Sequence, residues 1–149
     1  MVLVKQWIST MKLAQYDQYS IDLVDNILLV DAKGPFDSKA TQQYVQDMHN
    51  ACELFNNKPW GLLATFYGSR VFTPDAEIAL TDLTKYRVER GMIANASVIM
   101  NSNAGDTQQM QLRRIYQTCQ LTFHVFSNIE SARSWLQDYV ADKTQTVRA

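Results

Sequence analysis

The pattern of apolar and polar residues predicts a β-hairpin near the beginning of the chain. Residues 19–23 alternate between apolar and polar side chains, which is the two-residue period of a strand with one buried face. Asp25-Asn26 follows and suits a tight turn, because both residue types tolerate left-handed backbone dihedrals. Residues 27–32 are almost all apolar, so we expect a central strand that ends at Gly34-Pro35.

Helical and strand patterns alternate after this hairpin. A helix is predicted from Asp37 or Ser38, either of which could cap it, to about Asn56. The apolar run from Trp60 to Phe66 is too short for a helix and predicts a buried strand. Thr73-Pro74 predicts the start of a second helix that ends near Gly91, because proline is favoured at the first helical position.

The last third of the chain predicts a strand, a helix, a strand and a closing helix. The strands are expected at residues 96–100 and 123–126, with the helix between them at about residues 107–119. Ser127 and Glu130 form a capping-box pattern before the closing helix. The expected inward stripe of that helix is Ile129, Ala132, Leu136 and Tyr139.

These elements predict a single α/β domain with the order β-β-α-β-α-β-α-β-α. Strands that are joined through helices run parallel with right-handed crossovers, so the sheet should be mixed and mostly parallel. The first strand should be antiparallel, at or near an edge. We expect the domain to cover residues 18–141, after an N-terminal extension at 1–17 and before a polar tail at 142–149.

Composition excludes some classes of partner. The net charge is −1, from 14 basic and 15 acidic residues, whereas nucleic-acid binding proteins carry a basic excess or stripe. The longest aliphatic run, residues 27–30, is far too short for a membrane span. The two cysteines are sparse and far apart, which favours a reducing compartment. We therefore expect a cytoplasmic protein that binds no nucleic acid and has no membrane span.

Two histidines and two cysteines are the candidates for a metal site or a nucleophile. His49, Cys52, Cys119 and His124 could form a tetrahedral zinc site, but each also suits a packing position on a helix or strand. Both cysteines lie toward the C-terminal ends of predicted helices, where a thiol is not activated. We expect no metal, no cofactor and no catalytic residue from this set.

The candidate site lies in the loops that follow the parallel strands, where α/β sheets collect their ligands. These loops are residues 34–38, 67–73 and 101–106. The candidate ligand- or partner-binding residues in them are Phe36, Ser38, Tyr67, Ser69, Arg70, Phe72, Thr73, Ser102 and Asn103. Alternatively, these residues only cap helices and form turns. Arg70 and Phe72 favour a site, since a turn requires neither.

Three stretches of the chain resemble the SpoIIAA-like branch of the STAS superfamily, the fold of bacterial anti-sigma-factor antagonists. They are the hairpin at residues 19–34, the strand at 60–66 that leads into the Thr73 helix, and the closing sequence at 123–136. Members of that family carry a phosphorylatable serine in an Asp-Ser-Ser/Thr-Gly motif after the third strand. Here Tyr67-Gly68-Ser69-Arg70 stands at that place without the aspartate, and Ser69 is the phosphorylation candidate.

The resemblance implies a regulatory or binding role, through a protein partner or a small apolar or anionic ligand. Our first hypothesis is a non-enzymatic module of this kind. The alternative is a small enzyme whose site is built from the same loops. A third hypothesis is a structural subunit that acts as a homo-oligomer.

The loop at residues 67–73 gives a first testable prediction. Arg70→Ala removes a positive charge beside a helix N-terminus, and Ser69→Asp adds a negative one, so both variants should fold normally but bind a partner recovered by pull-down with altered affinity. The measurement is a binding titration together with a thermal melt. Unchanged affinity in both folded variants would show that the loop is only a connection.

Overall fold

The computed structural model describes residues 10–68, 71–100 and 105–148, with side chains to residue 144, and contains one six-stranded sheet and four helices. The strands are β1 (Met11–Gln15), β2 (Tyr19–Val24), β3 (Ile27–Ala32), β4 (Trp60–Tyr67), β5 (Met92–Met100) and β6 (Thr122–Phe126). The helices are α1 (Ser38–Glu53), α2 (Pro74–Glu89), α3 (Gly105–Thr118) and α4 (Ile129–Arg148). The predicted α/β class with a mixed sheet is confirmed.

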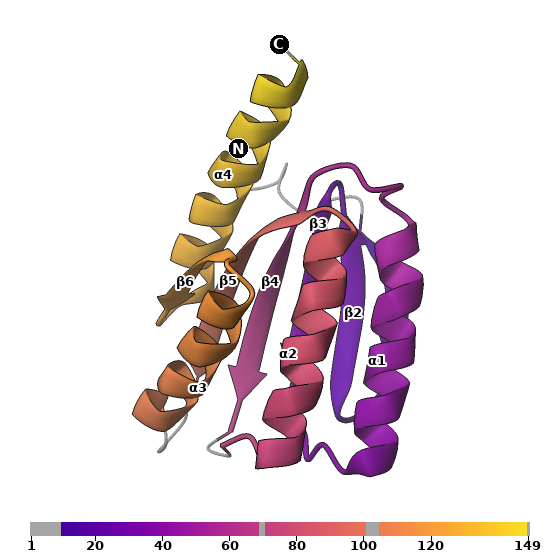
Figure 1. The fold of residues 1–149 in the computed structure, drawn as a ribbon, viewed down its shortest axis with the longest axis vertical. Helices are drawn as coiled ribbons and strands as arrows, with labels where there is room; N and C mark the ends of the chain where they lie inside the picture. The colour runs from indigo at the N-terminus through magenta and orange to yellow at the C-terminus, as the bar shows by residue number, and fades with distance from the viewer. Residues whose placement is uncertain (1–9, 69–70, 101–104, 149) are drawn as a thin grey trace.

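The six strands lie in the sheet in chain order, from β1 to β6. The pairs β1–β2 and β2–β3 are antiparallel, and the three pairs from β3 to β6 are parallel. Because right-handed crossovers between successive strands return on the same side, α1, α2 and α3 lie side by side on one face (Figure 1). Of the described elements, α4 alone covers the other face, and its last turns project beyond the sheet (Figure 1).

The structure differs from the sequence prediction at several element boundaries. The strand β1 was not predicted: it lies in the expected N-terminal extension and forms the sheet edge beside β2. β5 begins at Met92 rather than at Ala96, because pairing with β4 extends it. α4 continues through the expected polar tail to Arg148. No helix in the described part of the chain is both long and apolar enough to cross a membrane.

Side-chain caps begin the helices that face the candidate site. The Asp37 carboxylate accepts from the Ala40 amide at 2.8 Å, and the Thr73 hydroxyl accepts from the Ala76 amide at 3.1 Å. The start of α4 corrects the prediction of a Ser127 cap. There Asn128 Oδ1 accepts from the backbone N–H of Ser131 at 2.8 Å. Asparagine and serine are about equally favoured at this position, so the capping-box pattern alone did not identify the residue that caps.

α4 packs tightly on the middle of the sheet. Its fully buried residues are Ala132, Leu136 and Val140, whereas the predicted inward residues Ile129 and Tyr139 are only partly buried. Gly61 of β4 lies directly below: a Cβ there would come within 2.9 Å of Leu136 and 2.8 Å of Val140. The absence of a side chain at Gly61 therefore sets how closely this helix approaches the sheet.

Leu136→Ala should lower the free energy of unfolding by about 2–5 kcal/mol, because it leaves a cavity in a fully buried position. Urea denaturation measures the change. Leu54→Ala is the matched control, since Leu54 is 51% exposed and should cost less than about 0.5 kcal/mol. Equal effects of the two substitutions would contradict the packing of α4 described above.

Candidate functional site

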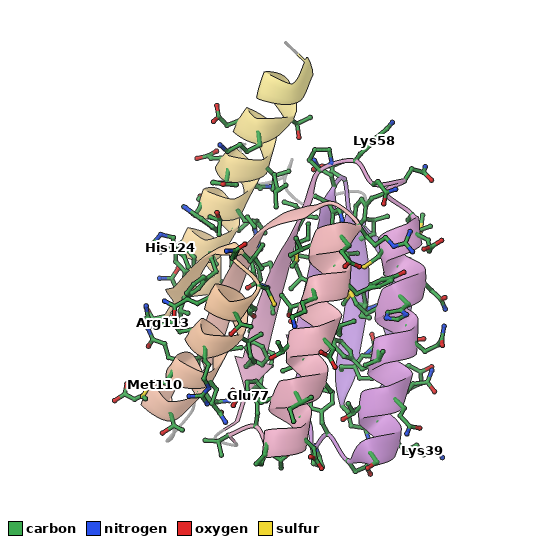
Figure 2. All side chains as sticks on the ribbon, viewed as in Figure 1. Lys39, Lys58, Glu77, Met110, Arg113 and His124 are labelled. Atoms are coloured by element: carbon green, nitrogen blue, oxygen red, sulfur yellow. The ribbon has the colours of Figure 1, made fainter. Side chains whose placement is uncertain are left out.

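An open groove of about 560 Å³ lies at the carboxyl ends of β3 and β4. It occupies the end of the molecule where Lys39 lies in the first turn of α1, opposite the end marked by Lys58 (Figure 2). The loop after β3 forms one wall, and the segment from Val71 to Thr73 forms the other. The groove therefore lies where the carboxyl-end rule for parallel sheets predicted a site.

Four of the predicted site residues line this groove: Phe36, Tyr67, Phe72 and Thr73. Thr73 also caps α2, so it is both a capping residue and part of the groove wall. Ser38 is exposed on the first turn of α1, and Asp37 lines the groove in its place. The remaining predicted residues lie outside the described part of the chain: Ser69, Arg70, Ser102 and Asn103.

The backbone of Phe72 is held in place by α3. Gln111 donates from Nε2 to the Phe72 carbonyl at 2.8 Å, and its Oε1 accepts from the Phe72 amide at 3.0 Å. A bidentate ion pair reinforces the same contact: Arg114 binds Glu77 at 2.6 and 2.8 Å, and Figure 2 shows Glu77 between α2 and α3. These contacts set the position of the Phe72 ring at the groove wall.

Beyond the groove lies an inner cavity of about 60 Å³ between α1, α2 and the sheet. The groove and the cavity share five wall residues, which are Ala32, Phe36, Phe66, Phe72 and Ala76. The rings of Phe66 and Phe72 meet edge to face with centroids 5.7 Å apart. The cavity therefore adjoins the groove on its inner side, and aromatic rings line the boundary between them.

The helices α1 and α2 are joined at the end away from the groove. The His49 ring stacks on the Tyr86 ring with centroids 3.9 Å apart, and the Arg90 guanidinium lies 5.0 Å from the centre of the same ring. Glu53 of α1 pairs with Arg90 at 3.8 Å. These contacts hold one end of the helix pair together, while the other end is separated by the groove.

The deep part of the cavity contains a buried cation. Arg87 of α2 is only 2% exposed and lines the cavity together with the hydroxyl-bearing residues Tyr44 and Tyr116. Its Nη2 donates to Thr84 Oγ1 at 2.9 Å. Burial raises the pKa of Tyr44, against a smaller lowering by the charge of Arg87 and by a hydrogen bond with it. Within the described part of the chain, no ion-pair partner of Arg87 is found, and no acceptor reaches its Nε. A buried guanidinium without a counter-ion carries a large desolvation cost.

A polar cluster on β5 adjoins this cation. Ser97 Oγ donates to Asn95 Oδ1 at 2.7 Å and lies 3.1 Å from the Tyr116 hydroxyl oxygen. Both β5 residues are fully buried, and Asn95 Nδ2 has no acceptor among the described residues. Burial raises the pKa of Tyr116, against a lowering by its hydrogen bond with Ser97 and by the charge of Arg87. Its hydroxyl therefore stays protonated at neutral pH.

The histidines and cysteines do not meet. Cys52 lies on the buried face of α1, and burial raises the pKa of its thiol to about 11, against a smaller lowering by the charge of Arg87. Cys119 donates to the Thr81 carbonyl at 3.6 Å on the same face, while His124 packs on Trp135 at 5.0 Å on the α4 side. Among the described residues, no three His, Cys, Asp or Glu side chains gather as metal ligands.

The sequence prediction missed Arg87, Asn95 and Ser97. Arg87 follows Leu80 and Leu83 at helical spacing, so the pattern places a charged residue on the buried face of the predicted helix. Asn95 and Ser97 alternate with alanines, which places both on one face of a strand. Both signals were readable, but only the packing of α1 to α3 shows that they belong to one buried cluster.

No protein-family model, curated protein or solved structure matches this chain significantly. The resemblance to SpoIIAA-like domains stays a prediction, and the site is interpreted from its own geometry.

Arg87→Met should leave the free energy of unfolding unchanged or raise it by up to about 4 kcal/mol, because a buried charge without a counter-ion is replaced by an apolar chain. Urea denaturation measures the effect. Arg114→Met, at the exposed ion pair with Glu77, is the matched control and should change stability little. A clear loss of stability specific to Arg87→Met would show that the guanidinium has a structural role.

Proposed function

We propose that the protein is a non-enzymatic, STAS-like binding module that takes a small, mainly apolar ligand through the groove into the cavity between α1 and α2. The observation that carries this proposal is the shared aromatic wall between the groove and the cavity. A ligand that enters from solvent would pass this wall to reach the core. The groove volume of about 560 Å³ lies within the range of small-molecule sites, roughly 300–1,000 Å³.

The energetic cost of the cavity supports a ligand-binding role. Protein cores are close-packed, and at about 24 cal/mol per Å³ a cavity of about 60 Å³ costs roughly 1.4 kcal/mol. Larger side chains at Ala76 and Ala79, which face the cavity from α2, would fill it. An apolar ligand in this space would recover the lost packing contacts.

The position of the groove also suits a regulatory role. The segment after β4 forms one wall of the groove, and SpoIIAA-like domains carry their phosphorylated serine in the corresponding loop. A ligand between Phe36 and Phe72 would alter the surface on which a protein partner docks. Ligand binding and partner binding would then be coupled through one loop.

Hexan-1-ol should raise the melting temperature of the protein, since a ligand that binds only the folded state stabilises it. Ala79→Leu should fold and abolish this shift, because the added carbons occupy the cavity. Ala141→Leu, on the exposed side of α4, should retain it. An equal shift in all three proteins would place alcohol binding elsewhere and contradict the proposal.

A further inference from the structure

We propose that the ligand of this cavity is a monocarboxylate with a slender apolar chain, whose carboxylate pairs with Arg87. This inference deepens the proposed function and rests on it. The starting observation is that Arg87, which is only 2% exposed, lines a cavity whose other walls are mostly apolar. Buried charges in proteins are normally paired, so the missing counter-charge is the feature to explain.

The unsatisfied donor in the cavity wall shows what the ligand must supply. Arg87 Nε has no acceptor in the described part of the chain, although Nη2 is bonded to Thr84. Asn95 Nδ2 is a second buried donor without an acceptor among the described residues, but Asn95 does not line the cavity, so Arg87 is the donor that a ligand there would meet. Arginine presents its donors as a planar fork that matches the two oxygens of a carboxylate.

The charge of the site favours one negative charge on the ligand. Arg87 is the single cationic residue that lines the inner cavity among the described residues, and the other polar groups there are neutral. A phosphate monoester carries about −1.5 to −2 charges near neutral pH and would keep an uncompensated charge in this environment. A carboxylate matches the guanidinium one to one. A neutral ligand would leave the charge of Arg87 without a counter-charge.

The shape of the site specifies the rest of the ligand. The residues of α2 that line the cavity run from Ala76 to Arg87, which is about 16 Å of helix at 1.5 Å per residue. A cavity of about 60 Å³ that follows this line is narrow, so an unbranched chain suits it better than a bulky ring. The carboxylate lies at the Arg87 end and the chain leads toward Phe72 and the groove.

Calorimetric titration with hexanoate and hexan-1-ol at pH 7 tests the inference. The wild-type protein should bind hexanoate at least tenfold more tightly than the alcohol, which has a chain of the same length but no charge. Arg87→Met should weaken hexanoate binding at least tenfold and abolish the preference for hexanoate over hexan-1-ol. Arg87→Lys keeps the charge but loses the planar fork, so its affinity for hexanoate should lie between those of the wild type and Arg87→Met. The Arg87 Nε–H resonance should shift when hexanoate is added to the wild-type protein.

The outcomes separate this inference from the proposed function. If hexan-1-ol binds in an Ala79-dependent way and hexanoate binds no more tightly, the apolar site stands and the carboxylate inference is overturned. The carboxylate inference is also overturned if Arg87→Met binds both probes like the wild type. If neither probe binds the wild-type protein, the proposed function fails and the inference fails with it.

Discussion

The fixed hand of the crossover connections decides the layout of this molecule. Strands β3 to β6 are parallel and follow one another in chain order, so each right-handed connection returns its helix to the same face. Three helices therefore share one face, and α4 is the one element in the described part of the chain that covers the other. α4 must therefore pack closely on the sheet. Gly61 allows this, because without a side chain there Leu136 and Val140 contact the sheet directly.

The cavity follows from the same layout. A doubly wound sheet opens a crevice where its crossovers change face, but the strands here never reverse their order. The inner cavity lies instead between two neighbouring helices and the sheet. α1 and α2 are joined by the His49–Tyr86 stack at one end and separated by the groove at the other, while α3 holds Phe72 from the side.

The core of this face combines apolar walls with a cation that has no counter-ion among the described residues. The chain accepts two costs there, a cavity and the desolvation of Arg87, although larger or neutral residues would remove both. Natural sequences break local packing rules mainly where a function needs it. The two departures lie in one cavity that adjoins an open groove, which is why we interpret them as one site rather than as separate defects.

Local sequence patterns were enough to specify the α/β class, the hairpin turn at Asp25, the α1 and α2 caps and the buried β4 strand, because periodicity and capping are local properties. They also placed the groove residues Phe36 and Phe72 in the right loops. The remaining features depend on tertiary packing. β1 became a strand because β2 offered it an edge, and α4 continued through a polar segment that no local signal marked as helical. Arg87 and Tyr116 are far apart in the chain and line one cavity only because the three helices pack together.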